Sequence, residues 1–190
     1  FAPAMAQVMD LDPEIMKEVH RDFLHHINRC GVTSISEMSA DDYTDTTHRN
    51  YTIVKEMDDA GDLTCRLHLY TKLDGYTDFS KALEYRKEFF SEKLRLNGVK
   101  GFIDGVTSTF TGLLLEPYSD RPETCGVDVP NATEEENTSY IIAANKAGLP
   151  VRLHCIADGS VRMALDMYEK SLNANGSQDF FNTVEHIENI

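Results

Sequence analysis

The sequence contains no tryptophan and few basic residues. Eighteen Lys and Arg residues against 32 Asp and Glu residues give a formal net charge of −14. Nucleic-acid phosphates and anionic membrane surfaces are both bound through clustered Lys and Arg. The composition therefore argues against nucleic-acid and membrane partners, and the acidity favours solubility.

Several motifs are also missing. No apolar run approaches the roughly 20 residues of a membrane-spanning helix. There is neither a Gly-rich phosphate loop after a predicted strand nor a G-x-S-x-G nucleophile motif. The few cysteines form no CxxC pair, which argues against a zinc ribbon and is consistent with reduced thiols in the cytoplasm. They are Cys30, Cys65, Cys125 and Cys155.

The N-terminal part predicts one amphipathic helix after a leader over residues 1–12. Asp12 is a suitable N-cap, and a proline follows it at the first helical position. The helix is expected to run to about Cys30. Its apolar residues recur every four positions and predict a buried stripe. The stripe consists of Ile15, Val19, Phe23 and Ile27.

The rest of the sequence alternates strand-like and helix-like segments, with a long polar connection over residues 105–132. This alternation predicts an α/β fold with parallel strands and right-handed crossovers. Both an open doubly wound sheet and part of a (β/α)8 barrel remain possible. The expected strands are 32–37, 63–70, 98–104, 150–156 and 181–188, and the expected helices are 45–60, 78–96, 133–148 and 159–172.

Residues that can carry chemistry lie at the carboxyl ends of these strands, where parallel α/β folds place their sites. His154 and His186 end two consecutive strands, and imidazole is the commonest transition-metal ligand. Lys100 lies inside an apolar strand, where an unpaired ammonium is costly. It is either a surface or salt-bridged lysine, or one carboxylated by CO2 to give an anionic metal ligand. Strand alternation puts Asp104 on the face of Lys100.

Several motifs together resemble the amidohydrolase superfamily, specifically the amidohydrolase-3 or YtcJ-like family. The resemblance runs from about residue 13 to 190. Single motifs are weak, but five in the right order form a specific pattern. They are 31–38 (GVTSISEM), 99–105 (VKGFIDG), 116–120 (EPYSD), 154–158 (HCIAD) with 164–169 (ALDMYE), and 184–188 (VEHIE).

The resemblance implies a distorted TIM barrel that binds one or two divalent metals, with zinc expected. Lys100, His154 and His186 match the family's ligands on strands 4, 5 and 6. The H-x-H pair of strand 1 and the general-base aspartate of strand 8 have no match, so that aspartate is expected beyond residue 190. The chain therefore resembles strands 2 to 6 of the barrel, a fragment of the catalytic domain.

The resemblance also suggests roles around the metal site. The loop 105–132, with Tyr118, is expected to cover the pocket and select substrate. Asp104, Asp158 and Glu185 are candidates for substrate contact or for orienting the ligands. Where the family often has Gly-Asp-Arg-Ala and a loop arginine, this chain has residues 157–160 (ADGS) and Phe110. Both departures predict the loss of a positive group.

The sequence thus predicts part of a metal-dependent amidohydrolase that cleaves an amide-type C–N bond in a small molecule. The isolated chain is expected to be inactive and to self-associate through exposed strand edges, at residues 32–37 or 181–188. Two alternatives remain. One is a metal-dependent deacetylase or isomerase of the same superfamily, and the other is a non-catalytic α/β binding module.

Overall fold

The computed structural model of this chain describes residues 12–126 and 132–190. The predicted leader, apart from its last residue, and part of the long loop lie outside these ranges. The strands are β1 (Ser34–Asp41), β2 (Arg66–Lys72), β3 (Leu94–Phe102), β4 (Val151–Cys155) and β5 (Thr183–His186). The helices are α2 (Pro13–Arg29), α3 (Asp45–Asp59), α4 (Ser80–Glu88), α5 (Glu134–Lys146) and α6 (Asp158–Asn175), with a short 3-10 turn η1 (Thr107–Thr109).

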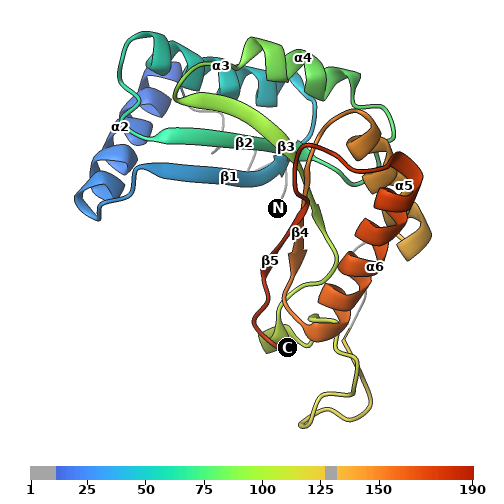
Figure 1. Ribbon diagram of the computed structural model, residues 1–190. Coiled ribbons are helices and arrows are strands. Elements are labelled where there is room, and N and C mark those ends of the chain that lie inside the picture. The colour runs from blue at the N-terminus through green and yellow to red at the C-terminus, as the bar shows by residue number, and fades with distance from the viewer. Residues whose placement is uncertain (1–11, 127–131) are drawn as a thin grey trace.

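The five strands form one parallel sheet in the order β1-β2-β3-β4-β5. A doubly wound sheet reverses its strand order at a switch point and carries helices on both faces. Here each right-handed crossover advances in the same direction, which keeps the helices on one side. Figure 1 shows the sheet curling, with α3 and α4 over β1–β3 and α5 and α6 beside β4. The predicted barrel-type β/α repeat is confirmed as a curled half-barrel.

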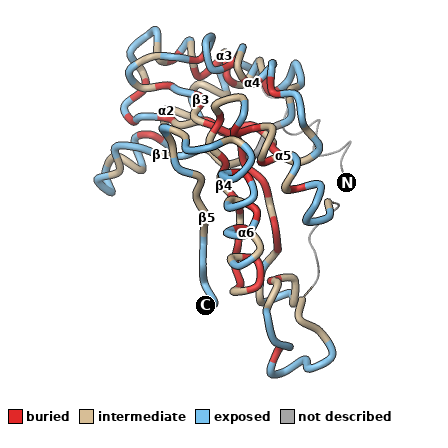
Figure 2. Tube along the Cα trace, turned by 45° about the vertical axis from the view of Figure 1, so that its right-hand side comes forward, coloured by how far each residue is buried: buried red, intermediate tan, exposed pale blue. Residues whose placement is uncertain are grey.

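The apolar core lies between the sheet and its helices, where Figure 2 shows the buried segments concentrated. Alternate residues of β3 and β4 face α5 and α6 in this core. The residues between them, including Lys100, Arg152 and His154, therefore face the concave side. The helix-facing set consists of Val99, Val151, Leu153 and Cys155, packed with Ile141, Ala144, Ala164 and Met167.

Helix α2 begins as predicted, but its apolar stripe is not buried. Asp12 caps the helix, since its Oδ1 accepts a backbone N–H 2.9 Å away. Ile15, Val19 and Phe23 remain 49%, 53% and 49% exposed, so the predicted burial is wrong for these three. The reason is that α2 packs against the rest of the fold through a different face, the one that contains the buried Leu24.

The helix predicted over 78–96 is too long. Helix α4 ends at Glu88, and Ser91 Oγ then accepts two backbone N–H bonds in a turn. Leu94 and Leu96 belong to β3, where they pair with β2 and are buried. The spacing of these apolar residues is compatible with both a strand and a helix. Pairing with β2 favours the strand.

Asp104 directly follows β3 and is 1% exposed. Its carboxylate accepts the backbone N–H groups of Ile156 (2.9 Å), Ala157 (3.1 Å) and Leu113 (3.1 Å). It also accepts the Ser160 hydroxyl at 2.6 Å. One buried charge thereby joins the end of β3, the long loop, the turn after β4 and the start of α6.

Two further hydrogen bonds attach the same loop to α6. Asp158 Oδ1 accepts the Leu115 N–H at 3.0 Å, and Ser160 N–H donates to the Leu113 carbonyl at 3.1 Å. A Cβ on Gly159 would lie 2.6 Å from that carbonyl, so this close approach requires glycine. The loop that borders the strand ends is therefore held by specific contacts.

Asp74, in the turn after β2, is a buried carboxylate of a different kind. Its Oδ1 lies above Gly101, where a Cβ would approach it to 2.9 Å, and this oxygen has no hydrogen-bond partner among the described residues. Burial raises the pKa of Asp74 to about 6, although Lys72, a Phe102 backbone hydrogen bond and Lys100 act to lower it. Burial thus outweighs its cationic neighbours.

We predict that Asp104→Asn lowers the free energy of unfolding by about 2–3 kcal/mol, because the amide NH2 would face buried N–H donors. Urea denaturation followed by circular dichroism measures the loss. Asp120→Asn, in the exposed part of the same loop, is the control and should stay within about 0.5 kcal/mol. Equal stabilities of the two variants would refute the role assigned to Asp104.

Asp74→Asn should stabilise the chain increasingly as pH rises from about 4 to 7. The unfolded carboxyl ionises near its ordinary pKa of 3.8, whereas the folded one ionises near 6. Ionisation therefore costs wild-type stability across that window and above it. The measurement is urea denaturation at pH 4, 5.5 and 7. Asp78→Asn is the control and should show no such stabilisation, because hydrogen bonds from Ser80 lower the pKa of Asp78 and so favour its ionised form in the folded chain.

Candidate metal centre

His154, the fourth residue of β4, has its tautomer fixed by one hydrogen bond. Its Nε2 lies 3.0 Å from the Gly105 carbonyl oxygen, which can only accept. In the neutral ring Nε2 therefore carries the proton, and Nδ1 keeps its lone pair. A ligating imidazole usually has such a partner on its second nitrogen.

His186, the last residue of β5, lies against His154, with ring centroids 4.4 Å apart. In the sheet register His154 is opposite Glu185, whereas His186 is opposite Cys155 on the helix-facing side. The backbone of His186 is left-handed, with φ 79°, and this departure from the strand conformation interrupts the alternation. The two imidazoles consequently meet even though strict alternation would separate them.

Burial lowers the pKa of His154, and the positive charge that His186 can carry lowers it further. The hydrogen bond to Gly105 and the charge of Asp104, whose Oδ1 is 3.8 Å from Nε2, oppose this shift. The net pKa lies below the ordinary 6.5, so His154 is neutral at pH 7. A neutral imidazole is the form that binds a metal.

Lys100 is 2% exposed on the concave face, and its Nζ lies 2.6 Å from Glu185 Oε2. Its ammonium also lies 5.2 Å from the centre of the Phe102 ring. The salt-bridged alternative considered from the sequence is the state that this structure shows. Pairing offsets the cost of burying the ammonium.

Glu185 also binds Arg152, whose Nη1 is 3.2 Å from Oε1 and whose guanidinium stacks on Tyr70 at 4.7 Å. Burial raises the pKa of Glu185, but the hydrogen bonds and charges of Lys100 and Arg152 hold it below its ordinary value. The sequence analysis did not identify Arg152. Its position two residues before His154 was the available signal, because strand alternation puts both on one face.

The other three predicted site residues are placed by the long loop. Asp104 and Asp158 use their carboxylates on backbone N–H groups, which suits positioning rather than substrate contact. Tyr118 is 8% exposed and donates its hydroxyl to the Gly112 carbonyl at 2.7 Å. Its ring lines a cavity together with Phe110.

The described residues supply only part of a metal site. Among them, no group of three or more His, Cys, Asp or Glu is arranged to hold a metal ion. His154 and His186 fit as two adjacent nitrogen donors, whereas the Lys100 ammonium has no lone pair to offer. The described residues thus offer two adjacent imidazoles but no complete set of metal ligands.

The remaining histidines and thiols do not extend the site. His68 bonds to Asn97 at 2.8 Å, and His48 pairs with Glu88 on the surface at 2.8 Å. Burial raises the pKa of the Cys155 thiol to about 12, which makes it a poor nucleophile at neutral pH.

Within the described ranges, the helices are too short or too polar to cross a membrane.

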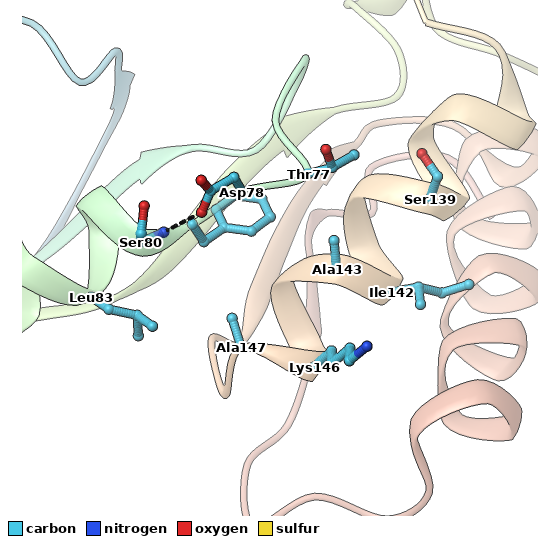
Figure 3. Close-up of a pocket in the computed structure, with 10 residues that line it drawn as sticks. Thr77, Asp78, Ser80, Leu83, Ser139, Ile142, Ala143, Lys146 and Ala147 are labelled. Atoms are coloured by element: carbon cyan, nitrogen blue, oxygen red, sulfur yellow. Dashed lines mark hydrogen bonds between the residues drawn. The ribbon is translucent and has the colours of Figure 1, made fainter.

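A cavity of about 640 Å³ lies between α4 and α5, away from the strand ends (Figure 3). Leu83, Ala143 and Ala147 form much of its apolar wall. Of its charged residues, Asp78 accepts the Ser80 N–H at 2.9 Å. This cavity contains no histidine or cysteine and is separate from the paired imidazoles.

Comparison with known proteins finds relatives of greater length. The chain is 37% identical over 117 residues to Protein LONG AFTER FAR-RED 3 of Arabidopsis thaliana, which covers 60% of this chain and 20% of that protein. It is 35% identical over 86 residues to YtcJ of Bacillus subtilis, provisionally named an amidohydrolase, covering 45% and 16%. The chain thus spans about a fifth or less of these two relatives.

A solved structure of similar fold is an uncharacterised metal-dependent hydrolase from Pyrococcus furiosus. Its TM-score is 0.69 at 27% identity, covering 89% of this chain and 34% of that one. The sequence profile of the amidohydrolase family matches residues 1–190 in full. Together with the half-barrel and the paired imidazoles, this match shows that the chain belongs to the amidohydrolase family.

Proposed function

We propose that this chain is part of a metal-dependent hydrolase that cleaves an amide-type C–N bond in a small molecule. The observation that carries the proposal is the contact of His154 with His186 at the ends of two neighbouring parallel strands. The family supports hydrolysis, and the similar Pyrococcus protein is named a metal-dependent hydrolase. The bond type is our inference.

His154, through Nδ1, and His186 would hold the metal, for which zinc suits imidazole donors. A metal bound there would supply Lewis-acid activation of water and of the substrate carbonyl. The role of this chain is to orient the donors. The Gly105 carbonyl fixes the His154 ring, and Asp104 fixes the turn that follows it.

We propose Lys100 as a further ligand only after its amine has added CO2. That step requires the ion pair with Glu185 to open and the ammonium to lose a proton to water, because an ammonium is not nucleophilic. The lone pair of Nζ then forms the bond to the CO2 carbon, a C=O π pair moves to oxygen, and the second nitrogen proton leaves to water to give the anionic carbamate. Arg152 would then remain as the cation on Glu185. Glu185 would thus keep a cationic partner when Lys100 becomes an anion.

The isolated chain is expected to bind metal weakly and to hydrolyse no amide, since the described residues offer two imidazoles and no third donor. The same centre would also serve a deacetylase or isomerase, and metal binding alone does not separate these. A reducing compartment such as the cytoplasm suits its four free cysteines.

We predict that Co2+ or Zn2+ titrated into the chain binds at one site with an affinity in the micromolar range or weaker. His154→Ala and His186→Ala should each reduce that affinity at least tenfold. Binding should weaken as pH falls below 6.5, because protons then compete for the His154 imidazole, whose pKa burial lowers from that value. Isothermal titration calorimetry at pH 5.5 and 7.5 makes the measurement.

His48→Ala is the matched control, because this exposed histidine pairs with Glu88 and lies outside the proposed site. It should leave metal binding unchanged. If all three variants bind metal as the wild type does, the site is wrongly assigned.

We also propose self-association through the sheet edges. β1 and β5 are the two edge strands, and each leaves one row of backbone groups without a strand partner in the described sheet. Sedimentation velocity at protein concentrations from about 5 to about 200 µM tests this association, because weak complexes dissociate in roughly that range. A single monomeric species throughout would count against edge pairing.

A further inference from the structure

A second cavity lies beside the loop that follows β3. It has a volume of about 500 Å³ and lies between the loop that follows β3 and the segment that follows β5. Both walls are tied to β4, because the loop begins at Gly105, which bonds to His154, and Asn189 N–H donates to the Ile156 carbonyl at 3.0 Å. Phe110 and Tyr118 supply its aromatic surface.

The backbone of Phe110 is held in an unfavourable conformation. Its φ of 58° and ψ of 33° lie in the left-handed region, which a bulky side chain rarely adopts. Two backbone hydrogen bonds fix it there, from Phe110 N–H to the Thr107 carbonyl (3.0 Å) and from Thr111 N–H to the Val106 carbonyl (3.1 Å). Such maintained strain is concentrated at functional positions, where it orients a side chain.

A guanidinium lies on the Phe110 ring, although Arg121 is not itself among the residues that line the cavity. The Arg121 Cζ is 4.3 Å from the centre of Phe110, and the Tyr118 ring is 5.1 Å from it edge-on. Arg121 N–H donates to the Tyr118 carbonyl, so a tight turn brings both side chains to Phe110. Its charged partner in the described chain is Glu123 at 4.0 Å, and the arginine stays about half exposed (54%).

We propose that this cavity and Arg121 bind an apolar or aromatic carboxylate, which makes Phe110 and Arg121 specificity-determining residues. The rings would contact the apolar part of the ligand, and the planar fork of Arg121 would bind its carboxylate through two parallel hydrogen bonds. Stacking on Phe110 restricts the guanidinium before binding, which reduces the entropy lost. That such a carboxylate is the substrate rests on the proposed function. Binding of the carboxylate in this cavity does not depend on the proposed function.

The competing ligand is a cation. Asp120 also lines the cavity, and aromatic faces attract ammonium groups. Asp120 and Arg121 are both exposed, but the charged group that stacks on the Phe110 ring is the arginine. A carboxylate is therefore the better match.

The test uses hippurate (N-benzoylglycine) as the anionic probe, its primary amide as the neutral analogue and phenethylammonium as the cation. Binding to the intact chain is measured by ligand-observed NMR in the presence of EDTA. Hippurate should bind at least tenfold more tightly than its amide. Arg121→Gln should remove that preference, and Phe110→Gly should weaken binding without lowering the thermal midpoint, because glycine relieves the left-handed strain.

Arg95→Gln is the matched control, because Arg95 stacks at 5.1 Å on the exposed Phe90, a ring that, unlike Phe110, does not line this cavity. It should bind hippurate as the wild type does. The proposal is overturned if hippurate does not bind, if its amide binds equally well, if Arg121→Gln has no effect, or if phenethylammonium is preferred.

Failure of this proposal is distinguishable from failure of the proposed function. EDTA removes metal from the probe experiment, so hippurate binding reports on the cavity alone. The calorimetric titration contains no hippurate and reports on the imidazoles alone.

Discussion

The buried carboxylate of Asp104 is the interaction on which the site depends. A charge this deeply buried is tolerated only when hydrogen bonds replace its hydration, and Asp104 receives four. Its donors come from the long loop, the turn after β4 and helix α6. The position of the His154 strand end, the path of the loop and the first turn of α6 are therefore determined together.

Electrostatics on the concave face follow a second pattern. Glu185 carries one negative charge between two cations, Lys100 and Arg152, on three neighbouring strands. Buried ion pairs contribute little net stability, because desolvation cancels most of the attraction. Their value here is geometric, since they keep charged side chains in fixed places on a surface where a closed barrel would need apolar packing.

The sequence predicted the parallel repeat, the order of its elements and the placement of both histidines at strand ends. It failed where tertiary contacts decide between two structures. The helix expected to reach residue 96 is too long, because Leu94 belongs to β3 and pairs with β2. It could not foresee the left-handed backbone of His186, which undoes strand alternation and brings two rings together. The sequence also did not indicate that Arg121, eleven residues after Phe110, would lie on the Phe110 ring.

The sequential winding of the sheet also shapes how the chain folds. Each strand pairs only with strands adjacent in sequence, so no contact of the sheet requires the closure of a very long loop. Each edge strand of the described sheet, β1 or β5, has a single neighbouring strand, whereas β3 at the centre has two strands on either side. Cooperativity should therefore decay outward from the centre, with β1 and β5 exchanging their amide hydrogens first and the β3 amides protected longest.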